Sequence, residues 1–223
     1  MTIHMWGREN SICTQRVLWA AYEANIDIEM TLASATMGHE GHISGGGQPY
    51  GLVHQKWYKS MNPTGAIPTI NDNGTIIWDS AAILTHLAIN HAPNKLIAGD
   101  MSNIAHAVKW ASWTNEHLEP ELHHLVMNLV RLPVEDRDLN IVNEAHFKVF
   151  GALSVLEQTL DHQGWLAGDE FTISDIPASA TIYRWTLFKP DFEIPPHVNT
   201  WLNKIKDRHP FKRAVAPLER HLS

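Results

Sequence analysis

The stretch that decides the fold is IPTINDNGTIIWDSAAIL, residues 67–84. Two short apolar runs flank an Asn-Gly pair at residues 73 and 74, which is the strongest local signal for a hairpin turn. Asp79 and Ser80 are residue types that favour the start of a helix, and apolar residues continue at helical spacing to about residue 90. The segment therefore predicts an antiparallel strand pair followed directly by a helix.

The residues before this segment predict a strand–helix–strand unit. Apolar residues recur at alternate positions over residues 3–6 and 26–30, and a helical pattern runs to Ala24 after a turn at residues 7–10. Strand, helix and strand within about thirty residues imply parallel pairing. The Gly- and His-rich residues 34–50 suit neither a strand nor a helix interior, so we expect a surface loop there. Together these patterns predict a βαβ unit followed by ββα.

The remainder of the chain reads as helical. Beyond about residue 95 no alternating strand pattern appears, and we expect a kink or break at Pro120 because proline interrupts helical hydrogen bonding. The sequence thus predicts an α+β domain at residues 1–92, with βαβ followed by ββα, and an all-helical domain at residues 93–223. Helices are expected at residues 102–130, 138–160 and 196–208.

The segment EFTISDI carries an unusually well specified helix start. Thr172 and Asp175 have the spacing of a capping box, and Phe171 and Ile176 are placed to pack across the first turn. We therefore expect a buried helix to begin here.

Composition narrows the function classes. The formal charge of −7 and the lack of a basic run argue against a nucleic-acid partner, and the apolar stretches are too short to span a membrane. One cysteine cannot form an internal disulfide, and the first thirty residues lack a leader pattern. A cytoplasmic protein is expected.

Four motifs in order carry a family resemblance. WGRENSICTQRVLW begins at Trp6, NPTGAIPTI at Asn62, WDSAAILTHLA at Trp78 and WLAGDEFTISDI at Trp165. With these motifs, the sequence resembles the cytosolic glutathione transferases, in particular bacterial members with a serine at the catalytic position. The resemblance implies a thioredoxin-like first domain, a helical second domain that forms an electrophile pocket, and a homodimer.

The resemblance also implies a glutathione site. The Ile67–Pro68 peptide bond is expected to be cis, and the main chain of Ile67 would pair with the cysteinyl backbone of glutathione. Asp79 and Ser80 would hold its γ-glutamyl end, which suits a hydroxyl and free N–H groups at a helix start. His54, or its neighbours Gln55 and Lys56, would contact the glycine carboxylate or the cysteinyl end of the tripeptide.

Ser11 is the candidate catalytic residue. Only a thiolate attacks well, and a thiol with a pKa near 8.5 is mostly protonated at neutral pH. Ser11 stands five residues before Arg16, the spacing found in several transferase classes, and its hydroxyl would donate to the glutathione sulfur. The alternative is that Ser11 only caps the first helix. Cys13 is a second candidate, although a lone cysteine in an apolar helix face is more often a buried residue.

Two further groups of residues are candidates for a pocket or a metal site. Trp110, Trp113, Thr114 and His117 share a helix face that would wall the electrophile pocket, and core packing is the competing hypothesis for the tryptophans. His39 and His42 lie in a Gly-rich stretch without the spacing of a metal site, as do the adjacent His123 and His124, so no metal is expected.

The sequence therefore predicts an enzyme that uses glutathione as co-substrate and needs no other cofactor. It would activate the glutathione thiolate for attack on a small apolar electrophile. Two alternatives stay open: a thiol–disulfide exchange enzyme that uses Cys13, and a binding protein that carries apolar ligands without turnover. The second is favoured by Asp79, where the family usually has Glu, and by Ala66, where plant-type relatives often have Gln.

Overall fold

A mixed sheet forms the amino-terminal part of the protein. The computed structural model describes residues 2–33 and 51–215, so the loop expected at residues 34–50 lies outside the described part. The sheet has the order β2-β1-β3-β4, with β2 parallel to β1 and β3 antiparallel to β1 and to β4. The predicted βαβ-then-ββα order is confirmed. The strands are β1 (Thr2–Gly7), β2 (Asp27–Leu32), β3 (Thr69–Asp72) and β4 (Thr75–Trp78).

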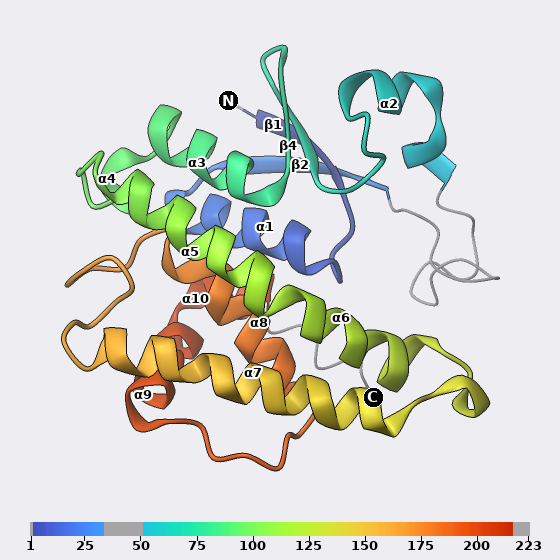
Figure 1. Cartoon of the computed structure of the whole chain (residues 1–223). Coiled ribbons are helices and arrows are strands. Elements are labelled where there is room, and N and C mark those ends of the chain that lie inside the picture. The colour runs from blue at the N-terminus through green and yellow to red at the C-terminus, as the bar shows by residue number, and fades with distance from the viewer. Residues whose placement is uncertain (1, 34–50, 216–223) are drawn as a thin grey trace.

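The hairpin and the first helix form where the local sequence specifies them. Asn73 and Gly74 both adopt positive φ, 50° and 92°, as a two-residue turn between antiparallel strands requires. Helix α1 (Ile12–Ala24) begins after Ser11 and ends at Asn25, which takes the left-handed conformation and donates its N–H to the last turn. The helices α1 and α3 (Ser80–Asn90) lie side by side, between the sheet and the helical part of the protein (Figure 1). A 3₁₀ turn (Gly51–His54) leads into the short helix α2 (Lys56–Met61).

The carboxy-terminal part is helical, as predicted. The helix expected at residues 102–130 is interrupted as anticipated, because α5 ends at His117 and α6 begins at Glu119 with Pro120 in its first turn. A π-helical turn (Met127–Arg131) and a 3₁₀ turn (Val134–Asp136) follow α6. The sequence patterns did not predict α2, α4 or α10, which have four to six residues each. The helices of this part are α4 (Pro93–Leu96), α5 (Asn103–His117), α6 (Glu119–Val126), α7 (Leu139–Leu160), α8 (Asp175–Leu187), α9 (Pro196–Asp207) and α10 (His209–Ala214).

Helix α8 is the central helix of the helical part. Every residue from 175 to 185 is buried. Its start is held by Asp175, whose carboxylate accepts hydrogen bonds from Leu166 N (2.9 Å), Thr172 N (3.0 Å) and Trp201 Nε1 (2.9 Å). Within the described residues, one apolar core continues from the sheet through α1 into α8 and α10. None of the described helices is both long enough and apolar enough to cross a membrane.

His146 on α7 gives the core a pH-dependent contact. Trp185 Nε1 donates to His146 Nδ1 at 2.9 Å, and burial lowers the pKa of this histidine below its usual value. Below about pH 6.5, His146 is therefore protonated more readily in the unfolded chain than in the folded chain. The stability that this group contributes is present above that pH and is lost as the pH falls below it. We expect the contribution of His146 to the free energy of unfolding to fall as the pH drops through this window, by at most about 1.4 kcal/mol per pH unit.

The measurement is urea unfolding at a series of pH values between about 7 and about 5. His146→Gln keeps an oxygen acceptor for Trp185 but does not titrate, so its stability should decline less steeply. An equal decline in His146→Gln and the natural protein would contradict the assignment.

Candidate active site

Ser11 lies at the junction of β1 and α1. Its side chain is 9% exposed, and its Oγ accepts a hydrogen bond from Thr14 N at 3.5 Å. The capping role is therefore present, although the bond is long. Because Oγ acts here as an acceptor, the hydroxyl hydrogen stays available to a ligand. A Cβ at Gly7 would lie 2.8 Å from Thr14 Oγ1, so glycine at this position allows α1 to start close to β1.

Two arginines connect this helix start to the helical part. Arg184 on α8 donates to Asn10 O (3.1 Å) and to Gln15 Oε1 (3.1 Å), so it fixes the backbone directly before Ser11. Arg16 donates to the Glu119 carboxylate and to Thr181 Oγ1. Burial lowers the pKa of Arg184 to about 10, which leaves it cationic at neutral pH.

Sequence reasoning missed these supports. In the sequence, each arginine stands among mostly uncharged helix neighbours, and that contrast is the one signal that could have indicated a buried role.

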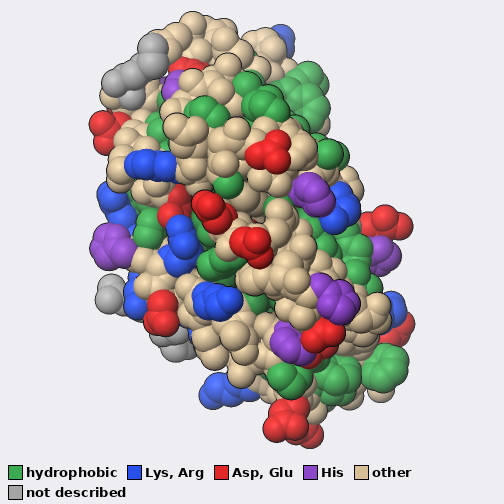
Figure 2. Space-filling model, turned by 90° about the vertical axis from the view of Figure 1, so that its left-hand side faces the viewer, with side chains coloured by type: hydrophobic (Ala, Val, Ile, Leu, Met, Phe, Trp, Pro, Cys, Tyr) green, Lys and Arg blue, Asp and Glu red, His purple; other side chains and the backbone are tan. Residues whose placement is uncertain are grey.

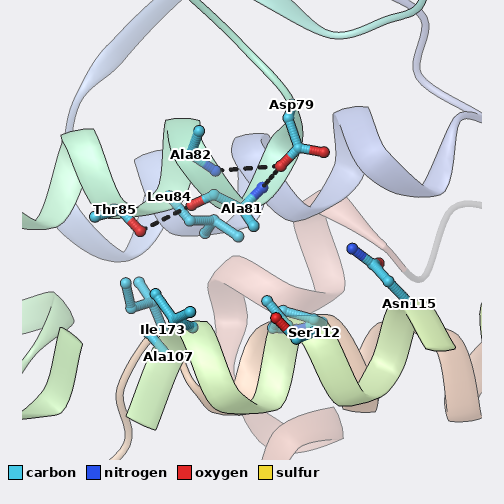
Figure 3. A pocket seen from close by; sticks show the side chains of 12 residues that line it. Asp79, Ala81, Ala82, Leu84, Thr85, Ala107, Ser112, Asn115 and Ile173 are labelled. Carbon is cyan, nitrogen blue, oxygen red and sulfur yellow. Dashed lines mark hydrogen bonds between the residues drawn. The ribbon is translucent and has the colours of Figure 1, made fainter. Parts of the chain in front are cut away.

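The turn into α3 brings Asp79 and Ser80 to the same region. Asp79 has φ 72° and ψ 128°, a conformation that a residue with a side chain adopts only under strain, and such strain concentrates at functional sites. Its Oδ1 accepts from Ala81 N (2.9 Å) and Ala82 N (3.3 Å), as Figure 3 shows, while the second carboxylate oxygen points away from these two donors. Ser80 is buried.

Cys13 joins the starts of α1 and α3. Its thiol lies close to the Ser80 side chain. Burial raises the pKa of the Cys13 thiol, and the nearby Arg16 and the contact with Ser80 offset only part of this effect. The thiol is therefore protonated at neutral pH, which suits a packing residue better than a nucleophile.

Pro68 directly precedes β3, beside the end of β1. The Ile67–Pro68 bond is cis. The loop before it is anchored at Ala66 O, which accepts from Tyr58 Oη (2.6 Å) and Asn62 Nδ2 (3.0 Å). Among the described residues, no hydrogen bond involves the main-chain groups of Ile67, so they are free to pair with an extended peptide. Tyr58 and Asn62 are supports that the sequence patterns did not single out.

The residues expected near the glycine end of a tripeptide are accessible. His54 ends the 3₁₀ turn, and Gln55 and Lys56 begin α2. All three side chains are exposed, and within the described part of the chain they form no hydrogen bond. They are therefore available to a ligand, but the structure gives no preference among them.

The proposed electrophile wall on α5 needs a correction. Trp110 is 3% exposed and donates to Leu166 O at 2.8 Å, and Thr114 is fully buried and donates to Trp110 O at 2.7 Å. These two side chains belong to the core, because their polar atoms are satisfied inside the protein. Trp113 is partly exposed and His117 is exposed, with ring centroids 5.7 Å apart.

A groove of about 390 Å³ lies between α3 and α5. Figure 3 shows Asp79 above the groove, with Ser112 and Asn115 on the facing helix. Small apolar residues form much of its lining, among them Ala82, Val108 and Ala111. The sequence patterns did not predict this groove, because the residues predicted to line a pocket included Trp110 and Thr114, which lie on a different face of α5.

Comparison with known proteins supports one family. The chain matches the model of the glutathione S-transferase N-terminal domain over residues 10–88 and that of the C-terminal domain over residues 106–208. It is 27% identical to the glutathione S-transferase GstB of Escherichia coli K12, covering 96% of this chain and 97% of that one. It is 28% identical to a glutathione S-transferase of Silene vulgaris, covering 97% and 98%.

A solved structure gives the same result. A theta class glutathione S-transferase from Xanthomonas axonopodis pv. citri, crystallised with glutathione bound, has a TM-score of 0.80 and 27% identity, covering 96% of both chains. The two domain models together span most of this chain, in the order of its sheet and helical parts. The chain belongs to the glutathione S-transferase family.

Proposed function

We propose that this glutathione transferase ionises glutathione beside Ser11 and directs the thiolate at a small apolar electrophile. The observation that carries the proposal is the packing of α1 against α3, which brings the starts of the two helices together with Cys13 close to Ser80. Ser11 precedes the first of these helices, and Asp79 precedes the second. Both starts present N–H groups and the positive end of a helix dipole, which favour anionic groups.

The same geometry supports a placement for glutathione. The unpaired main-chain groups of Ile67, beside Pro68, would pair with the cysteinyl backbone. The γ-glutamyl carboxylate would lie against the Ser80 hydroxyl, and the free carboxylate oxygen of Asp79 would accept from the γ-glutamyl ammonium. The exposed His54 would approach the other end of the tripeptide. This arrangement leaves the thiol near Ser11.

Thiolate formation and alignment account for the chemistry. The thiol proton would leave to solvent, and the Ser11 hydroxyl would then donate a hydrogen bond to the anionic sulfur. Holding the electrophile beside the sulfur converts a bimolecular attack into a nearly intramolecular one. We propose that no metal and no second cofactor take part in this step, because hydrogen-bond donors suffice for it. Trp113 and His117 are the α5 residues of the predicted set that remain accessible to an electrophile.

The surface and composition support proposals about the domains, assembly, partners and location of the protein. Residues 1–92 and 93–223 would act as two domains, with glutathione held by the first. A homodimer is supported by the groove between α3 and α5, where Val108 is 54% exposed. Basic and acidic side chains are interspersed on the face in Figure 2, and the net charge of −7 supports partners other than nucleic acid. The single cysteine is consistent with a cytoplasmic location.

The test of the proposed function is the ultraviolet absorbance of the thiolate when glutathione is added to the protein at neutral pH. We expect the absorbance of bound thiolate, together with conjugation of glutathione to members of a panel of apolar electrophiles. Glutathione that binds but stays protonated, without conjugation, would instead support the binding-protein alternative.

Cys13→Ser separates the transferase from a thiol-exchange enzyme. We expect this variant to keep its conjugation activity within about twofold, because the raised pKa of Cys13 disfavours the nucleophilic thiolate. Alkylation of Cys13 by iodoacetamide, followed by mass spectrometry, should be much slower than that of free cysteine. Loss of activity in Cys13→Ser but not in Ser11→Ala would favour the exchange mechanism.

A further inference from the structure

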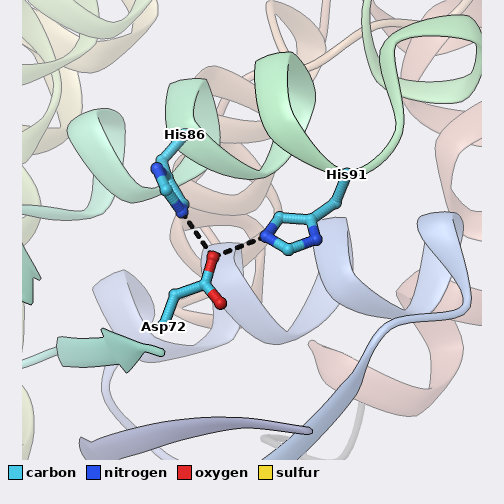
Figure 4. A group of neighbouring side chains, drawn as sticks. All are labelled: Asp72, His86 and His91. Carbon is cyan, nitrogen blue, oxygen red and sulfur yellow. Dashed lines mark hydrogen bonds and ion pairs between the residues drawn. The ribbon is translucent and has the colours of Figure 1, made fainter. Parts of the chain in front are cut away.

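Three side chains at one end of the sheet converge on a single oxygen atom. Asp72 is the last residue of β3, His86 lies on α3, and His91 directly follows that helix. The two Nε2 atoms lie 2.7 Å and 2.6 Å from the same carboxylate oxygen, Asp72 Oδ2. Figure 4 shows both imidazole rings pointing toward the carboxylate from α3 and from the turn after it.

The ligand atoms of these three side chains all lie within 4.8 Å of one another. The side chains are 8%, 15% and 18% exposed, so the group is sheltered but within reach of solvent. Sequence spacing did not reveal the group, because its members are 14 and 19 residues from Asp72 and match no metal-site motif.

Neighbouring amides orient the group. Asn73 Nδ2 donates to the second oxygen of Asp72 at 2.9 Å, and Asn90 Nδ2 contacts His86 Nδ1 at 3.1 Å. Burial opposes ionisation of Asp72, but the hydrogen bonds from His86 and His91 outweigh it and lower the pKa of the carboxyl. The carboxylate is therefore ionised at neutral pH, as a metal ligand must be.

We propose that Asp72, His86 and His91 form a binding site for a divalent transition metal of the zinc class. Two imidazoles and one carboxylate suit Zn²⁺, and three protein ligands leave a fourth position for water. At metal–ligand distances of about 2.0–2.2 Å, tetrahedral geometry puts ligand atoms about 3.3 Å apart. The observed Nε2–Oδ2 separations of 2.6 Å and 2.7 Å would have to widen by about 0.6–0.7 Å, and the two Nε2 atoms, which lie within 4.8 Å of each other, would have to come to about 3.3 Å as well.

Metal binding would need the Nε2 lone pair of both histidines. In a neutral imidazole the hydrogen moves by way of solvent from Nε2 to Nδ1 with no net proton release, whereas a doubly protonated imidazole releases its Nε2 proton to solvent and keeps the one on Nδ1. In either case His86 then carries its hydrogen on Nδ1. A half-turn of the Asn90 amide would place its oxygen against this N–H, at the loss of the present 3.1 Å bond from Asn90 Nδ2 to His86 O.

The site is separate from the proposed glutathione site. Asp72 lies at the opposite end of β3 from Pro68, and His86 and His91 follow Ser80 by roughly 9 Å and 16 Å along the helix axis. A bound metal would join the β3–β4 hairpin to the carboxy-terminal end of α3. The proposal is therefore independent of the transferase activity and predicts metal-dependent stability of this unit.

The experiment is a zinc titration of the chelator-stripped full-length protein, by calorimetry and by competition with a chromophoric chelator. We expect one high-affinity site per chain and a rise in the melting temperature with zinc. His86→Ala and His91→Ala should each weaken zinc binding by about 100-fold or more, and Asn90→Ala by about 10- to 100-fold. Co²⁺ bound at the site should give the visible spectrum of tetrahedral nitrogen and oxygen coordination.

Two variants serve as controls. His162→Ala removes an exposed histidine elsewhere, and His39→Ala with His42→Ala removes the Gly-rich pair; both should bind zinc like the natural protein. Melting temperatures of all variants without metal report whether they fold. The proposal is overturned if the His86→Ala, His91→Ala double variant, shown to be folded, binds zinc as tightly as the natural protein. It is also overturned if the natural protein has no stoichiometric site.

Discussion

Ser11→Ala is expected to raise the pKa of bound glutathione by about two units, from about 6.5 to about 8.5. That shift corresponds to roughly 2.7 kcal/mol, which is within reach of one charge-assisted hydrogen bond together with the helix dipole. At neutral pH the thiolate fraction should fall by about 25-fold, because most of the thiol then keeps its proton. The measurement is thiolate absorbance of the protein–glutathione complex as a function of pH, together with kcat/KM for conjugation.

A second substitution separates activation of the thiol from capping of the helix. Alanine at the N-cap typically costs about 1 kcal/mol of stability, whereas glycine costs only a few tenths. Ser11→Ala and Ser11→Gly both remove the hydroxyl, so a role in activation predicts the same shift in thiol pKa in both. Ser102→Ala is the matched control, since Ser102 precedes α5 without a side-chain cap bond. An unchanged thiol pKa in both Ser11 variants would leave Ser11 with the capping role alone.

Asp175→Ala is expected to lower the free energy of unfolding by about 3–5 kcal/mol. The carboxylate accepts from three buried donors, Leu166 N, Thr172 N and Trp201 Nε1, and each donor left without a partner costs about 1–3 kcal/mol. Burial raises the pKa of Asp175 to about 6, so the desolvation cost of the charge offsets part of this gain. We therefore expect a loss of stability near the low end of the sum of the costs of the three unpaired donors.

Urea unfolding at neutral pH measures this change. Asp175→Asn keeps one oxygen acceptor but places an amide N–H₂ where an oxygen stood. We therefore expect it to lower the free energy of unfolding, but by less than Asp175→Ala does. Asp169→Ala removes an exposed aspartate six residues away and should change stability by less than about 0.5 kcal/mol. A loss below about 1 kcal/mol in Asp175→Ala would show that the three donors find other partners.

Local chemistry made much of the fold predictable. The Asn73-Gly74 pair needs positive φ at both residues, and few other sequences form such a turn, so the hairpin followed from two residues. The break before α6 followed from Pro120, and the start of α8 from the spacing of Thr172 and Asp175. In each case the signal lies within a few residues, because backbone geometry and capping act over one turn.

The candidate site was predictable only in part. The family motifs named Ser11, Asp79 and Ser80, and the structure brings the two helix starts together through Cys13. The face of α5 that meets the groove was not predictable, because apolar residues occur around most of that helix. Periodicity shows that a face is apolar but does not say whether it meets the core or a ligand.

The sequence by itself determined the order of the strands and the longer helices along the chain, the hairpin turn and several helix starts, because these depend on neighbours along the chain. The tertiary structure alone decided which distant side chains meet. Arg184 reaches Asn10 across 174 residues, and Asp72 meets His86 and His91 only after the hairpin folds against α3. Such contacts depend on how whole elements pack, and no local pattern encodes that packing.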